Sequence, residues 1–84
     1  MESIKATVKE FILTEFLPGE RPEALEDSTP LITGGILDSI ATVRLVFFLE
    51  ENFGVHFDPH EMSPDQLDSI DVIAETVHAK RSLL

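Results

Sequence analysis

The chain has 84 residues, 43% of them hydrophobic and 26% charged; this suits one soluble domain, 1–84, and no apolar run approaches the ~18 residues of a membrane span. Its formal net charge is −10, and fifteen acidic but only two basic side chains lie between Glu10 and Glu75, so nucleic acid is excluded as a partner and basic proteins are favoured. Cysteine is absent, which excludes disulfides and thiolate metal sites, and residues 1–10 lack the apolar core of a signal peptide, so we expect a cytoplasmic protein.

The first predicted helix covers residues 3–16, where apolar side chains recur at helical spacing until Pro18-Gly19 ends the pattern. Residues 20–30 contain two prolines and four acids, which is typical of a long, irregular surface connection. The apolar pairs Leu31-Ile32 and Ile36-Leu37 interrupt this polar stretch. We expect them to hold the loop against the helices.

The longest predicted helix runs from Ser39 to Phe53, a length of about 22 Å. Gly34-Gly35 precede it as a flexible hinge, and either Asp38 or Ser39 supplies the N-cap side chain. Gly54 is predicted to end it as a left-handed C-cap. Ser39 therefore lies at the exposed start of a long, well-anchored helix.

Two shorter elements complete the chain. A third helix is predicted at Pro64–Leu67, with Ser63 opening a capping box, and a last helix follows Ser69 and continues to about Lys80. No strand pattern competes, so the predicted fold is an all-α four-helix bundle with three longer helices, one short third helix and a long first loop. The apolar positions expected to form its core are Ile4, Val8, Phe11, Ile12, Ile40, Val43, Val46, Phe47, Leu49, Phe53, Ile70, Ile73 and Val77.

The sequence offers little for catalysis by the chain itself. A nucleophilic serine needs a nearby base, and the candidate bases, His56, His60 and His78, are all predicted to lie far from Ser39. The acidic residues 58–68 lack the central glycine and the ligand spacing of a calcium loop. We therefore expect neither an enzyme nor a metal site.

Ser39 could still be modified by another enzyme. A phosphate on its oxygen would meet the positive end of the helix dipole, where anions are stabilised. The competing interpretation is that Ser39 is an ordinary N-cap, since serine is common at that position.

The stretch Gly-Gly-Ile-Leu-Asp38-Ser39-Ile40, the long helix that ends in Leu-Glu-Glu-Asn-Phe-Gly-Val and the surrounding elements closely resemble acyl carrier proteins over nearly the whole chain. In that family, the serine of an Asp-Ser-Leu motif carries 4′-phosphopantetheine, which comes from coenzyme A and holds cargo as a thioester. The resemblance places this group on Ser39, flanked by Asp38 and Ile40, with isoleucine replacing the family's leucine.

The tripeptide Asp-Ser-Ile occurs a second time, at residues 68–70. Ser39 is the preferred site because a glycine pair precedes it and the longest helix follows it, as in the family. Ser69 is predicted to be a helix N-cap.

The resemblance also implies partners: a phosphopantetheinyl transferase, a ligase or acyltransferase that loads acyl or aminoacyl groups, and downstream enzymes of fatty acid or specialised-metabolite biosynthesis acting on a monomeric carrier. Family members of fatty acid synthesis usually carry acids early in this helix, where this chain has Ala41 and Arg44. The expected partner surface is therefore mixed in charge: Arg44, Leu45, Phe48, Glu50 and Glu51. The alternative function is an unmodified acidic helical adaptor that binds a basic protein.

Overall fold

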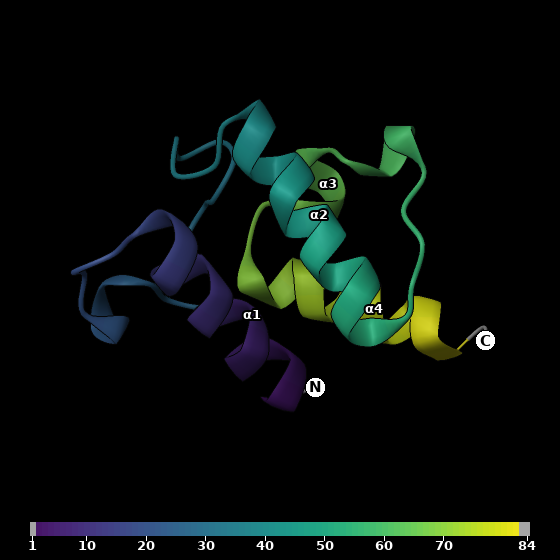
Figure 1. The fold of residues 1–84 in the computed structure, drawn as a ribbon, viewed down its shortest axis with the longest axis horizontal. Helices are drawn as coiled ribbons and strands as arrows, with labels where there is room; N and C mark the ends of the chain where they lie inside the picture. The colour runs from purple at the N-terminus through teal and green to yellow at the C-terminus, as the bar shows by residue number, and fades with distance from the viewer. Residues whose placement is uncertain (1, 83–84) are drawn as a thin grey trace.

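The computed structural model describes residues 2–82, which form a small bundle of helices (Figure 1). The α-helices are α1 (Glu2–Phe16), α2 (Ser39–Phe53), α3 (Pro64–Leu67) and α4 (Ile70–Ser82). Helix α4 packs against α1 and α3 and also contacts α2, behind which it passes in Figure 1. Over these residues, the prediction of an all-α chain with three longer helices and one short helix is confirmed. No helix among the described residues has the length and apolar composition needed to cross a membrane.

Two short 3-10 turns, Pro22–Ala24 and Pro59–Glu61, lie in the connections between the helices. Gly54 ends α2 as predicted: its φ is 67°, and its N–H donates to the carbonyl oxygen of Glu50 at 3.0 Å. The capping box predicted at Ser63 is wrong, because the Ser63 side chain makes no capping hydrogen bond. The box instead belongs to the preceding turn, where the Glu61 carboxylate accepts from the Asp58 N–H at 2.9 Å.

The long first loop, residues 17–38, contributes directly to the core. Leu25, Leu31 and Leu37 are buried, while Ile32 and Ile36 are partly buried and pack against the core. The expectation that apolar pairs hold this loop onto the helices is confirmed. Leucines buried along the loop, the last of them next to Asp38, fix the path by which the chain reaches α2.

The predicted core is correct for α4 and, apart from Phe11, for α1, but it is partly wrong for α2. Ile40, Val43 and Phe47 expose 74%, 40% and 59% of their surfaces. The buried face of α2 instead comprises Ala41, Thr42, Leu45, Val46 and Leu49. The sequence could not distinguish these faces, because α2 carries large apolar residues on both and helical spacing fits either one.

Leu45 was expected on the partner surface, and this prediction is wrong because its side chain is completely buried. Phe11 and Phe53, expected in the core, are only partly buried, and Phe11 stacks on Phe48 with ring centroids 4.0 Å apart. This aromatic contact links α1 to α2.

The burial pattern of α2 predicts opposite outcomes for two substitutions two residues apart. Leu45→Ala should lower the free energy of unfolding by about 2–5 kcal/mol, because it leaves a cavity in the core. Phe47→Ala should change it by no more than about 0.5 kcal/mol, because the ring is mostly in solvent. Equilibrium urea denaturation of both variants measures the difference, and equal losses would contradict this orientation of α2.

Candidate functional site

The exposed N-terminus of α2 separates the roles of Asp38 and Ser39. Asp38 is the N-cap: its Oδ1 accepts from the Ala41 N–H at 2.8 Å, and its backbone oxygen accepts from both the N–H and the hydroxyl of Thr42. Ser39 is thus the first helical residue, and the interpretation of Ser39 as the N-cap is wrong. Among the hydrogen bonds of residues 2–82, none involves the Ser39 hydroxyl, which leaves that exposed oxygen available for chemistry.

The second Asp-Ser-Ile tripeptide uses its side chains differently. The Oγ of Ser69 accepts from the Val72 N–H at 3.2 Å, and its backbone oxygen accepts from Ile73 at 2.9 Å. Ser69 is half-buried and caps α4, as predicted. The two identical tripeptides therefore differ in the hydrogen bonding of the serine Oγ: the Oγ of Ser69 accepts a hydrogen bond, and that of Ser39 makes none among the described residues.

A short segment, residues 31–37, leads the chain into the site. A hydrogen bond from the Leu37 N–H to the Leu31 oxygen, at 2.8 Å, joins the two ends of the segment. Within it, the Gly35 N–H donates to the Ile32 oxygen at 3.1 Å and closes a turn. Gly35 has a φ of 84°, and a Cβ atom at Gly34 would collide with the carbonyl oxygen of Pro30. The glycine pair, predicted as a hinge, is thus required by a tight turn and a close backbone approach.

Asp68, which the sequence analysis placed only in the second tripeptide, holds this segment. Its carboxylate accepts from the N–H groups of Ile32 and Thr33 and from the Thr33 hydroxyl, at 2.8–2.9 Å. The backbone N–H and hydroxyl of Thr33 lower the pKa of Asp68 below its ordinary value. No local pattern predicts this contact, since the partners lie 35 and 36 residues apart.

A hollow of about 440 Å³ lies beside Ser39. It is named here the Ser39 hollow, and its lining residues are Ile32, Leu37, Asp38, Ser39, Thr42, Val43, Met62 and Pro64. Most of this lining is apolar, and it comes from segment 31–37, from α2 and from the residues before α3. None of the eight is a histidine or lysine, and the one carboxylate among them, that of Asp38, already accepts the capping hydrogen bond from the Ala41 N–H.

An apolar stripe runs from the same helix end along the exposed side of α2. This α2 stripe consists of Ile40, Val43 and Phe47, spaced by three and four residues and therefore on one face. Val43 belongs to both the stripe and the Ser39 hollow. Anything that approaches the Ser39 oxygen meets this apolar surface next to it.

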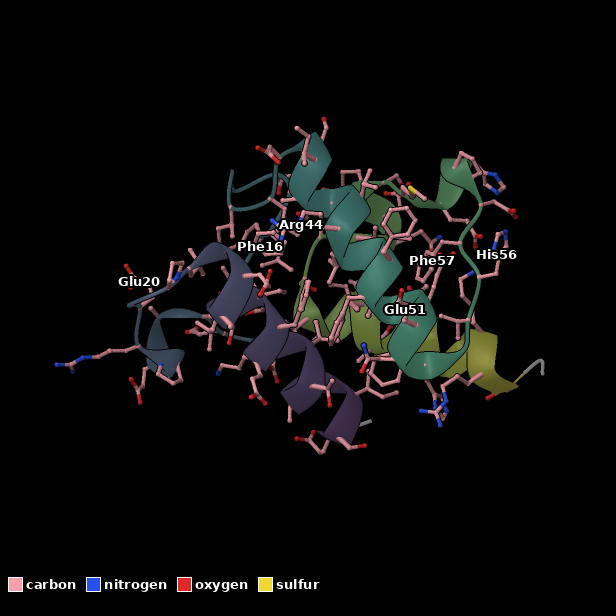
Figure 2. The ribbon with its side chains drawn as sticks, viewed as in Figure 1. Phe16, Glu20, Arg44, Glu51, His56 and Phe57 are labelled. Atoms are coloured by element: carbon pink, nitrogen blue, oxygen red, sulfur yellow. The ribbon has the colours of Figure 1, made fainter. Side chains whose placement is uncertain are left out.

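The polar residues predicted on the partner surface are partly engaged within the chain. Arg44 donates to Glu15 at 2.7 Å and lies 5.5 Å from the Phe16 ring centroid, and Figure 2 shows Phe16 and Arg44 close together between α1 and α2. The Glu50 carboxylate accepts from the Phe57 N–H at 2.9 Å. Glu51 is exposed near the C-terminal end of α2 (Figure 2). Of the charged pair at the end of this helix, Glu51 is thus the more available for a partner.

One group of potential metal ligands lies away from Ser39. Single ligand atoms of Asp58, His60 and Glu61 come within 4.8 Å of one another. The Lys80 ammonium, however, lies 2.7 Å from Glu61 Oε2, and this contact together with the capping hydrogen bond from Asp58 lowers the pKa of Glu61. A cation there would have to compete with a positive charge already in place.

Comparison with known proteins gave no match: no protein-family model matches the chain, and no curated protein does. The function is therefore inferred from the chemistry of the Ser39 site. That site combines an unengaged hydroxyl at the positive end of a helix with an adjacent, mostly apolar hollow and an apolar stripe that shares Val43 with the hollow.

The hydrogen bonds of the two serines predict different stability effects. Ser69→Ala should lower the free energy of unfolding by about 0.5–2 kcal/mol through loss of the α4 cap. Ser39→Ala should leave it within about 0.5 kcal/mol of the wild type, because no cap is lost. Thermal and urea unfolding of the two variants provide the measurement, with Asp38→Ala as the variant that removes the α2 cap. A Ser39→Ala loss as large as that of Asp38→Ala would contradict the assigned roles.

Proposed function

We propose that this chain is a carrier protein of the acyl-carrier type, primed on Ser39 with 4′-phosphopantetheine from coenzyme A, and that it is not itself an enzyme. The observation that carries the proposal is the division of roles at the start of α2, where Asp38 caps the helix and the Ser39 hydroxyl is left unengaged. The sequence resemblance to acyl carrier proteins and the bundle of three longer helices and one short helix support it.

In priming, the Ser39 oxygen forms a bond to the pantetheine-side phosphorus while the phosphoanhydride bond of coenzyme A breaks. Adenosine 3′,5′-bisphosphate leaves, and the transferase accepts the serine proton. The new phosphodiester is an anion at the N-terminus of a fifteen-residue helix, where free N–H groups and the helix dipole stabilise negative charge. When bound, the group supplies a thiol that holds cargo as a thioester.

The residues around Ser39 fit such a group. The Ser39 hollow offers an apolar wall, to which Ile32, Leu37 and Met62 contribute, beside the point of attachment. Asp38 acts by fixing the start of the helix, and Ile40 offers exposed apolar surface next to the attached group.

The proposed docking surface for the transferase, the loading ligase or acyltransferase and the downstream enzymes is the α2 stripe, with Glu51 adding negative charge. Desolvated apolar residues supply most of the binding energy in small interfaces, and charges at the rim set partner choice. Because Arg44 is paired with Glu15, its charge is partly neutralised before any partner arrives. The cargo is an acyl or aminoacyl group of fatty acid or specialised-metabolite biosynthesis.

Priming is tested by incubating the protein with coenzyme A and a phosphopantetheinyl transferase, then measuring the intact mass. The wild type and Ser69→Ala should each gain one phosphopantetheine group, and Ser39→Ala should gain none. If Ser69→Ala abolished the gain while Ser39→Ala retained it, the site assignment would be wrong. If no form gained mass, the function left standing would be the unmodified acidic adaptor, for which the α2 stripe and the acidic surface would serve as the binding face.

The docking role of the α2 stripe is tested with the same transferase. Ile40→Ser should lower kcat/KM for priming about tenfold, the loss typical of truncating a central interface residue. Ala79→Ser, an exposed change of similar chemistry on α4, is the matched control and should leave kcat/KM unchanged. Both variants should unfold at the wild-type temperature, since both side chains are exposed. Equal rates for Ile40→Ser and wild type would remove the stripe from the interface.

A further inference from the structure

Asp68 lies at the junction of α3 and α4 and does not line the Ser39 hollow, yet it determines where one wall of that hollow stands. Its carboxylate accepts three hydrogen bonds from Ile32 and Thr33, and its backbone oxygen accepts a fourth, from the Leu31 N–H at 2.6 Å. The three bonds to the carboxylate are named here the Asp68 latch. Hydrogen bonds to an ionised group are shorter and stronger than neutral ones, so the latch is a firm attachment.

The latch acts on the part of segment 31–37 that the core does not hold. Leu31 and Leu37 are buried at the two ends of the segment and are joined to each other by a backbone hydrogen bond. Ile32 is only partly buried, and Thr33, Gly34 and Gly35 are exposed. Without the latch, the core contacts of Leu31, Ile32, Ile36 and Leu37 would remain. The exposed residues between them, Thr33 to Gly35, would be held only by the turn hydrogen bond from the Gly35 N–H to the Ile32 oxygen.

Ile32 connects the latch to the site. Its N–H donates to Asp68, and its side chain lines the Ser39 hollow together with Val43, Met62 and Pro64. The segment continues through Leu37 into Asp38 and Ser39. The position of the hollow's outer wall, and of the backbone that leads to the serine, therefore depends on the latch.

We propose that Asp68 is a positioning residue for the modification of Ser39, holding segment 31–37 in the one arrangement that a transferase binds. This inference rests on the proposed priming of Ser39. A segment that is held before the encounter does not have to be ordered during it, so the latch raises the fraction of molecules competent to bind. The apparent affinity scales with that fraction, whereas the chemical step at the Ser39 oxygen, which Asp68 does not touch, is unaffected.

The consequence is a split between the two kinetic constants. Asp68→Ala should raise the KM of the carrier for the transferase about tenfold while kcat stays within about twofold of the wild type. Asp68→Asn keeps the shape and one acceptor oxygen but loses the charge, so its KM should fall between those of Asp68→Ala and the wild type. Asp65→Ala, which removes an exposed carboxylate from the adjoining short helix α3, is the matched control for net charge and should leave KM unchanged.

A second readout reports on the latch without any enzyme. Amide hydrogen exchange in the unprimed protein should be faster at Ile32 and Thr33 in Asp68→Ala than in the wild type, while exchange in α2 and α4 stays the same. Thr33→Val removes only the hydroxyl bond and should accelerate exchange at these amides to a smaller extent. Asp68→Asn and Thr33→Val carry the test if Asp68→Ala does not fold.

The outcomes separate this inference from the proposed function. The positioning role is supported if three results are obtained together: the wild type is primed, amide exchange at Ile32 and Thr33 is faster in the Asp68 variants, and their KM is higher while kcat is unchanged. If the wild type is primed but the KM of the variants is unchanged, or kcat falls instead, the positioning role is overturned while the carrier function stands. Unchanged exchange at both amides overturns the latch itself. Failure to prime the wild type overturns the carrier function and this inference with it.

Discussion

The rotation of α2 about its own axis is the constraint on which the site depends. Burial of Leu45, Val46 and Leu49 fixes that rotation, because turning the helix would expose three completely buried side chains at about 1.5–3 kcal/mol each. With this face inward, Ile40, Val43 and Phe47 face outward. The same rotation presents Ser39 to solvent, so the core packing of one helix determines what an approaching protein meets.

The helices were predictable because residues at or next to their ends determine where they begin and stop. Pro18-Gly19 and Gly54 stop α1 and α2, and Pro64 begins α3, each through a backbone restriction that needs no knowledge of distant residues. The buried face of α2 was not predictable, since apolar residues surround much of the helix. Its orientation is decided by contacts with α1 and α4, which the periodicity of α2 alone does not describe.

The candidate site was predictable only where it depends on local sequence. The position of Ser39 at a helix start followed from sequence, but Asp38 and Ser39 are both good N-caps, and only the backbone geometry assigns the cap to Asp38. Two capping-box patterns stand five residues apart, at Asp58–Glu61 and Ser63–Gln66, and only the first forms the box in the structure. The contacts of Asp68 with Ile32 and Thr33 join distant parts of the chain and leave no local signature.

Two lysines, Lys5 and Lys80, form ion pairs that join different parts of the chain. Lys5 lies 2.9 Å from Asp71 and 3.8 Å from Asp27, so it ties α1 to α4 and to the first loop, and its pKa is raised chiefly by the hydrogen bond to Asp71. Lys80 likewise ties α4 to Glu61 and lies 4.7 Å from the Phe57 ring centroid. These two cations serve internal contacts, and the net charge of −10 leaves the exterior of the protein mostly acidic.

The separation of the cap from the reactive oxygen has a consequence for inhibition. Because the Asp38 side chain stabilises the helix, the fold does not require serine at position 39, and a chain with alanine there would present the same stripe and the same hollow. Under the proposed carrier function, such a chain would occupy the same partners without ever receiving cargo. In a cell that makes both forms, the altered copy would act as a dominant-negative competitor whose potency depends on its abundance relative to the intact carrier.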